Sequence, residues 1–295
     1  YDKYRNQFPV IHISFNEFGR RCNSYEQHIE WIEKRLVKDL KKEYPEAGIS
    51  EEAGAAETLL ELYAEDDTVQ FIFVLDEWDF IFHQNFITEN DKRDYLSFLR
   101  NLLKDKPYVR LAYMTGILPI AKYSSGSELN MFSEFTMASE ERFSEYFGFT
   151  EKDVDLLFSR YQERNEKQKQ VTREGLKEWY DGYHTKAGER LYNPRSVVMS
   201  LSNNNLGNYW TSSGPYDELY YYIERNVDAV RDDLVRMVSG IPVPAKVREY
   251  AATSQELKTK EEIFSAMVVY GFLSYENGKV SIPNKELGDK FAEML

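Results

Sequence analysis

Residues 71–79 read Phe-Ile-Phe-Val-Leu-Asp-Glu-Trp-Asp, an apolar run of five that ends at two adjacent carboxylates. A short continuous apolar run is typical of a strand that is buried on both faces, as in the parallel sheet of an α/β protein. Ligands of open α/β sheets bind beyond the carboxyl ends of the strands. The stretch therefore predicts a buried strand that presents Asp76 and Glu77 at the ligand-binding edge of a parallel sheet.

The two carboxylates suit a phosphoryl-transfer site of the Walker B type. Magnesium prefers hard oxygen ligands, so Asp76 is the candidate metal ligand, directly or through water. Glu77 is the candidate general base for an attacking water. The alternative is a core strand whose next turn is acidic, and this short motif alone leaves both interpretations open.

Strands and helices alternate over residues 1–139, which predicts a parallel α/β domain. The patterns predict strands at 8–15, 71–76 and 108–114, and helices at 24–44, 51–64 and from about residue 90. Thr115 follows the last of these strands, where its hydroxyl would contact a γ-phosphate or its attacking water. The alternative is that Thr115-Gly116 only ends the strand, and the preceding acidic strand favours the first interpretation.

The pattern changes after residue 139. Mostly helical segments are expected over 140–254, with turns at Asp181-Gly182 and Ser213-Gly214. Residues 255–295 read as helix, hairpin and helix, with Asn277-Gly278 as a strong hairpin signal and Asn284 as the cap of the last helix. We expect a helical lid followed by a winged-helix-like tail.

Composition narrows the class of protein. Aromatic residues make up 15% of the chain, which excludes disorder, and the net charge of −13 argues against a strong nonspecific grip on nucleic acid. The four histidines have no metal-like spacing, and Cys22 is the only cysteine, so neither a disulfide framework nor a thiolate cluster is expected. No stretch is long and apolar enough to span a membrane, and a cytoplasmic location is expected.

Eight ordered motifs carry a family resemblance. They are Leu-Asp-Glu-Trp-Asp (75–79), Thr-Gly-Ile-Leu-Pro-Ile-Ala-Lys (115–122), Glu-Leu-Asn-Met-Phe (128–132), Phe-Gly-Phe-Thr-Glu-Lys-Asp-Val (147–154), Trp-Tyr-Asp-Gly-Tyr (179–183), Leu-Tyr-Asn-Pro-Arg-Ser-Val (191–197), Tyr-Trp-Thr-Ser-Ser-Gly (209–214) and Ile-Pro-Asn-Lys-Glu (282–286). Together, over nearly the whole chain, they resemble the bacterial predicted AAA-ATPase family, whose members usually carry a C-terminal nuclease domain of the PD-(D/E)XK type.

The resemblance implies a P-loop NTPase that binds ATP and Mg²⁺, with Asp76 and Glu77 at Walker B and Thr115 at the sensor position. It also implies a nuclease domain in cis, a possible homo-oligomer and an arginine finger that the sequence does not identify. Three departures stand out. No G-x-x-x-x-G-K-[ST] loop occurs in the sequence, so we expect it upstream of Tyr1; Arg195 replaces the family's usual tryptophan; and the chain stops at Leu295, about where the nuclease would begin.

Two other functions stay open. The chain would be a regulatory or interaction scaffold for a nuclease if its NTPase site is degenerate. A nucleic-acid-binding tail would need a basic last helix, but Lys285 and Lys290 are outnumbered there by acidic residues. A nuclease metal pair of Glu77 and Asp79, which are two residues apart, is disfavoured by the missing lysine partner and by the negative net charge.

Overall fold

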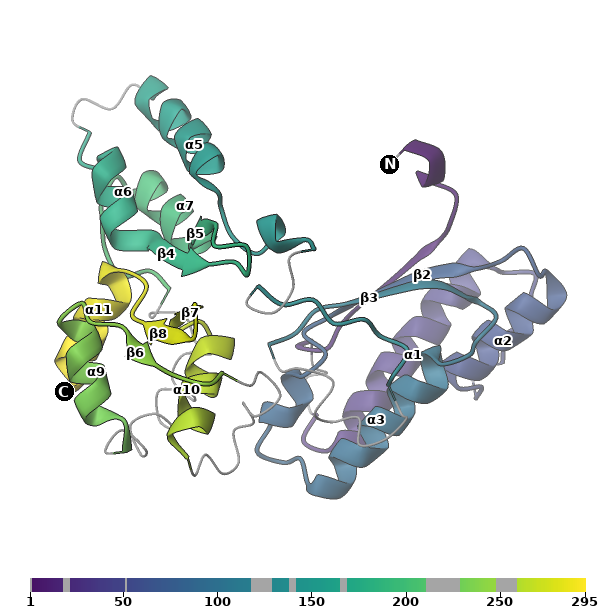
Figure 1. Cartoon of the computed structure of the whole chain (residues 1–295). Coiled ribbons are helices and arrows are strands. Elements are labelled where there is room, and N and C mark those ends of the chain that lie inside the picture. The colour runs from purple at the N-terminus through teal and green to yellow at the C-terminus, as the bar shows by residue number, and fades with distance from the viewer. Residues whose placement is uncertain are drawn as a thin grey trace. The chain divides into compact units, whose positions relative to one another are not determined.

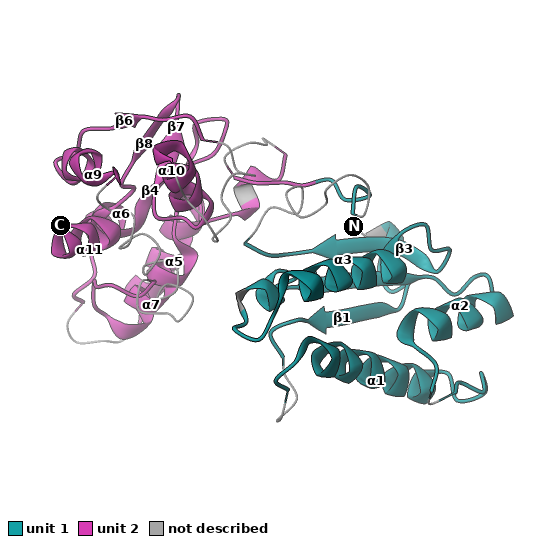
Figure 2. Ribbon diagram, turned by 90° about the horizontal axis from the view of Figure 1, so that it is seen from below, with its two compact units in different colours: residues 1–133 teal, residues 134–295 magenta. Residues whose placement is uncertain are grey.

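The computed structural model describes residues 2–17, 22–50, 52–117, 129–137, 142–164, 169–210, 229–247 and 259–295. The chain divides into two compact units, residues 1–133 and 134–295 (Figure 2). We describe each unit by itself. No helix of the described residues is long and apolar enough to cross a membrane.

Unit 1 is an α/β fold built on a parallel sheet. Its three strands lie in the order β1 (Val10–Ser14), β2 (Phe71–Asp76) and β3 (Val109–Met114), and both pairings are parallel. Each strand begins and ends within two residues of its predicted range. The parallel sheet expected from the alternating pattern is therefore confirmed.

Three helices connect and cover these strands: α1 (Tyr25–Glu43), α2 (Ala55–Glu65) and α3 (Glu89–Leu103). Ser24 caps α1 as predicted, because its side chain accepts a hydrogen bond from the backbone of Gln27. The helix predicted from residue 51 begins only at Ala55. Its first turn is capped from outside, since Glu33 of α1 accepts the backbone N–H of Ala55 at 3.2 Å.

The prediction that the strands are buried on both faces is wrong. All three helices lie against the same face of the sheet (Figure 1), where alternate residues of β1 and β2 are buried. The register places Val10, Ile72 and Leu111 side by side on the other face, and Val74 beside Tyr113. Leu111 and Tyr113 of β3 are 56% and 60% exposed. A continuous apolar run does not reveal whether one or both faces of the strand are covered.

Unit 2 contains helices and two small antiparallel sheets. Its helices are α5 (Glu151–Glu163), α6 (Arg173–Tyr180), α7 (Pro194–Asn203), α9 (Arg231–Val238), α10 (Lys260–Val269) and α11 (Lys285–Met294). Its strands are β4 (Asp181–His184), β5 (Arg190–Tyr192), β6 (Val243–Pro244), β7 (Ser274–Glu276) and β8 (Lys279–Ser281). A helix predicted at 216–226 falls outside the described residues.

The turn predicted at Asp181-Gly182 is wrong, because both residues belong to β4, which pairs with β5. Gly182 has φ +125°, and a Cβ there would lie 1.9 Å from the carbonyl oxygen of Pro283. Glycine is thus needed at 182 because the backbone of Pro283 comes close, and not because the chain reverses there. By contrast, the hairpin at Asn277-Gly278 joins β7 to β8 as predicted.

One core of unit 2 contains side chains from both sides of residue 254. It includes Tyr183, Leu191, Val230, Leu234, Met237, Val243, Ile263, Phe264, Met267, Phe272, Leu273, Val280, Leu287 and Phe291. A second core lies between α5, α6 and α7, around Tyr161, Tyr180 and Val197. The division into a helical lid at 140–254 and a winged-helix-like tail at 255–295 stays a prediction.

Candidate nucleotide site at the carboxyl edge of the sheet

The carboxyl edge of the parallel sheet brings together the residues that follow its strands. Ser14 at the end of β1 is paired with Asp76 at the end of β2. The backbone N–H of Thr115, just past β3, donates to the carbonyl of Leu75 at 2.8 Å. Residues separated by about a hundred positions in the sequence therefore lie at one edge, as the strand order predicts.

Thr115 contacts Asp76 directly. The Thr115 hydroxyl donates a hydrogen bond to Oδ1 of the half-buried Asp76 carboxylate. This contact joins the two residues assigned to the metal and to the γ-phosphate. It brings a carboxylate oxygen and a hydroxyl together at this edge. A carboxylate oxygen is a suitable ligand for magnesium, and a hydroxyl can donate a hydrogen bond to a phosphate.

Glu77 turns away from the strand and is exposed. Its φ is +52°, in the left-handed region that non-glycine residues rarely adopt. The alternation of the strand ends here, so Glu77 and Asp79 do not share a face. Asp79 is 3% exposed, and its Oδ2 accepts the backbone N–H of Ile117 at 3.0 Å. The residues do not form a metal pair.

Asp79, Trp78 and Gly116 are parts of this edge to which the sequence analysis gave no role in a nucleotide site. Trp78 is buried, and its backbone N–H donates to the carbonyl of Thr115 at 3.0 Å. A Cβ on Gly116 would lie 2.3 Å from Cδ1 of Trp78. Only glycine fits next to Thr115, but this requirement comes from a tertiary contact and cannot be recognised in the sequence.

The histidines have separate surroundings among the residues that the structure describes. His12 is exposed. His28 of α1 is buried, and the loss of hydration lowers its pKa, whereas a hydrogen bond to the backbone of Phe15 acts in the opposite direction. His184 of β4 faces Ser274, with 3.1 Å between Nδ1 and Oγ. The side chain of His83 lies outside what the structure describes. Among the described residues, no group of three or more His, Cys, Asp or Glu side chains could hold a metal ion.

Further residues of types that can contact nucleotides or nucleic acid pack against aromatic rings, are exposed or fall outside the described residues. Trp210 packs edge-on against Phe272 with 5.4 Å between ring centroids, so it is a packing anchor. Arg142 stacks over the rings of Phe135 and Phe143. Lys246 is exposed. Arg248 and the tyrosine run 220–222 lie outside the described ranges.

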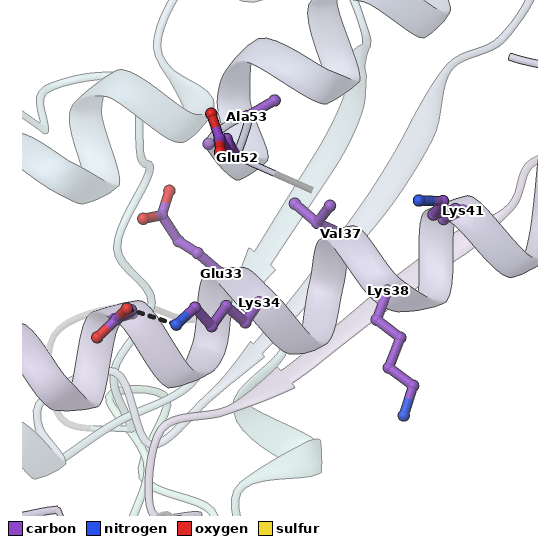
Figure 3. A pocket seen from close by; sticks show the side chains of 9 residues that line it. Glu33, Lys34, Val37, Lys38, Lys41, Glu52 and Ala53 are labelled. Atoms are coloured by element: carbon purple, nitrogen blue, oxygen red, sulfur yellow. Dashed lines mark hydrogen bonds and ion pairs between the residues drawn. The ribbon is translucent and has the colours of Figure 1, made fainter. Parts of the chain in front are cut away.

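A groove of about 660 Å³ lies between α1 and the segment before α2 (Figure 3). Lys34, which lines the groove, is paired with Glu30, and Glu33 caps α2 as described above. The N-terminus of α2 therefore already has a carboxylate partner from the protein. The groove offers a mixed-charge surface and not an anion site.

Unit 1 thus belongs to the class of open α/β domains that present an acidic strand end at their ligand-binding edge. A family model described as "Predicted AAA-ATPase" matches residues 1–125. Residues 1–125 are therefore similar to this family, and the resemblance of the later motifs stays a prediction. No curated protein matches the chain.

Three solved structures show partial similarity. They are the Walker-type ATPase PABY2304 of Pyrococcus abyssi (13% identity, 96% of this chain and 84% of that chain, TM-score 0.49), Cdc6p from Pyrobaculum aerophilum (12%, 99% and 80%, 0.36) and the Aeropyrum pernix ORC2 protein in ADPNP–ADP complexes (12%, 97% and 87%, 0.37). All three TM-scores are below 0.5, so these similarities carry no argument about activity.

Proposed function

We propose that unit 1 is the nucleotide-hydrolysing part of an AAA-ATPase-like protein, with magnesium-dependent ATP binding and hydrolysis as its activity. The observation that carries the proposal is the hydrogen bond between Thr115 and Asp76 at the carboxyl edge, inside the segment that matches the family. In phosphoryl transfer the protein mainly positions groups and stabilises charge, and this pair has the side chains for that task.

Asp76 would hold the magnesium ion. A carboxylate has about four acceptor sites, so the hydrogen bond from Thr115 leaves capacity for a cation on the same group. Its half-buried position also limits competition from bulk water. Bound magnesium would neutralise charge on the phosphates.

Glu77 would accept the proton of the attacking water. It follows Asp76 directly, and its left-handed backbone places the side chain in solvent, where water is available. Thr115 would donate its hydroxyl to the γ-phosphate in place of Asp76. A change of acceptor by Thr115 would then report whether the phosphate is present.

The phosphate cradle has to come from residues other than those we assign. The sequence contains no glycine-rich loop ending in Lys-Ser or Lys-Thr, and such loops bind phosphates through backbone N–H groups and the lysine. We therefore expect residues 1–295 alone to bind ATP weakly. The second candidate function is a scaffold for a nuclease whose NTPase site is degenerate, and it would be favoured if the natural protein has no such loop.

We further propose that unit 2 acts as a helical lid with a winged-helix-like tail, in a cytoplasmic, homo-oligomeric protein that carries its nuclease domain in cis. Contact with nucleic acid through the tail would be indirect only. Two lysines of α11 support this, because Lys285 is 3.5 Å from Asp289 and Lys290 is 3.7 Å from Glu293. Neighbouring carboxylates reduce the attraction of these cations for phosphates.

The magnesium dependence of ATP hydrolysis by the natural protein tests the role of Asp76. Asp76→Asn removes one anionic oxygen ligand, and we expect apparent magnesium affinity to fall by roughly 10–100-fold. Asp66→Asn, at an exposed carboxylate beyond α2, is the control and should match the wild type. An unchanged magnesium requirement in Asp76→Asn would remove this residue from the metal site, and no ATPase activity in the wild type would favour the scaffold.

A further inference from the structure

The segments that follow β2 and β3 are fastened to each other by three hydrogen bonds. The Thr115 hydroxyl donates to the Asp76 carboxylate, the Trp78 N–H donates to the Thr115 carbonyl, and the Ile117 N–H donates to the Asp79 carboxylate. We call residues 76–79 and 115–117 with these bonds the strand-end clasp. Two of its three bonds use a carboxylate, that of Asp76 at the end of β2 and that of Asp79 after it.

Aromatic side chains of α3 and of the segment after β2 hold the clasp in place. The Tyr95 hydroxyl of α3 donates to the carbonyl of Trp78 at 2.6 Å. Trp78 and Phe82 meet edge-on at 5.4 Å, and Phe82 in turn meets Tyr95 at 5.8 Å. The segment after β2 is thus held by the helix layer as well as by the clasp.

Asp79 closes the clasp at its far end. Ideal Cβ placement on Gly116 would bring that atom within 2.6 Å of Asp79 Oδ1 and 2.3 Å of Trp78 Cδ1, so the two segments are in tight contact. The Asp79 side chain is nine-tenths or more buried, and it accepts the N–H two residues beyond Thr115. A buried carboxylate that binds a backbone N–H forms a strong, directional restraint.

We infer that Asp79 is a positioning residue, which fixes the segment after β3 and thereby sets the Thr115 hydroxyl against Asp76. It touches neither proposed ligand. Its expected effect on turnover rests on the proposed function, but its effect on the geometry of the clasp does not. Placement of a reacting group depends on such supports, and a displacement of about 1 Å can cost on the order of 10²-fold in rate.

Amide-resolved hydrogen exchange of the 295-residue chain, without nucleotide, tests the geometry. In Asp79→Ala we expect the amides of Ile117 and Trp78 to exchange at least about tenfold faster, the factor that one typical net hydrogen bond represents. Asp79→Asn keeps an oxygen that can accept the Ile117 N–H and should retain the protection. Asp66→Ala, which removes an exposed carboxylate that accepts the N–H of Thr68, is the matched control.

Unchanged protection at Ile117 in Asp79→Ala, or equal loss in the Ala and Asn variants, would overturn the inference. Should Asp79→Ala not fold, Gly116→Ala perturbs the clasp from its other side and leaves Asp79 in place. Loss of protection at Ile117 in that variant supports the clasp, and full protection contradicts it.

Kinetics of the natural protein separate the inference from the proposed function. We expect Asp79→Ala to lower kcat by about 10²-fold with little change in the KM for ATP, and Asp79→Asn to recover most of the rate. A wild-type kcat in Asp79→Ala would refute the positioning role while the ATPase stands. An inactive wild type would refute the proposed function, and the exchange experiment would still decide whether Asp79 holds the clasp.

Discussion

Glu286 is a buried carboxylate that joins distant segments of unit 2. It is 1% exposed, and its Oε1 accepts the backbone N–H groups of Tyr209 and Trp210, each at 2.6 Å. Its Oε2 accepts the hydroxyl of Ser196 at 2.8 Å. Burial raises the pKa of Glu286, and the three hydrogen bonds oppose that change. Three of the sequence motifs beyond residue 125 therefore meet at one structural contact.

We expect Glu286→Ala to lower the free energy of unfolding of unit 2 by about 2–6 kcal/mol. Two backbone donors lose their acceptor, at roughly 1–3 kcal/mol each. Glu286→Gln keeps an oxygen for these donors and should cost less. Hydrogen exchange of the Tyr209 and Trp210 amides, combined with denaturant unfolding, measures both effects. Equal losses in the two variants would show that the hydrogen bonds do not account for the stability.

His28 gives unit 1 a defined response to acid. Burial lowers its pKa, whereas in the unfolded chain the pKa is about 6.5. Above pH 6.5 both states are neutral at this group, so its contribution is constant. As the pH falls below about 6.5 the unfolded state binds the proton first, and stability is lost until the folded pKa is reached.

We therefore expect the opening free energy of α1 amides, measured by hydrogen exchange, to fall between pH 7 and 5 in the wild type and to fall less in His28→Phe. Ile29→Val, at a neighbouring buried position, should lower stability without changing the slope against pH. The same slope in His28→Phe and the wild type would assign the acid response to other groups.

At the scale of elements, the strands of unit 1 were predictable because apolar runs between polar segments are local signals. The alternating pattern placed Asp76 and Thr115 at the ends of successive strands, but their direct hydrogen bond was not predicted. The role of Asp79 did not, because alternation in an extended strand would place it beside Glu77, and the positive φ of Glu77 breaks that alternation. Strand β4 was not predicted, because Gly182 is required by the close approach of the Pro283 backbone, about a hundred residues away, and not by a turn.

Phe272 connects the last elements of unit 2. It is buried between Trp210 and Phe291, with ring centroids 5.4 Å and 6.5 Å away. We expect Phe272→Ala to destabilise unit 2 by roughly 3–5 kcal/mol, the cost typical of removing a fully buried ring. Denaturant unfolding checks this value, and Tyr275→Ala, at a half-buried neighbour, serves as the comparison. A loss below about 1 kcal/mol would mean that the core around Phe272 rearranges freely.

At the scale of the whole molecule, the two units divide the tasks that we propose. Unit 1 contains the segment that matches the family model and the strand-end clasp, while Glu286 and Gly182, which belong to motifs of unit 2, make packing contacts. The carboxylates that we propose for the site could be named from the sequence, because phosphoryl transfer would need such residue types at the carboxyl edge of the sheet. The packing roles of the later motifs could not be found, since they depend on contacts between residues far apart in the chain.

The most direct test of the central claim is single-turnover hydrolysis of ATP by the natural protein and its Glu77→Gln variant. The amide keeps the size of the side chain but cannot accept a proton, so we expect ATP binding to be retained and the hydrolysis rate to fall by roughly 10²–10⁴-fold. Glu61→Gln, on the exposed side of α2, should hydrolyse ATP like the wild type. A Glu77→Gln variant that binds and hydrolyses ATP at the wild-type rate would contradict the assignment of this edge as the catalytic site.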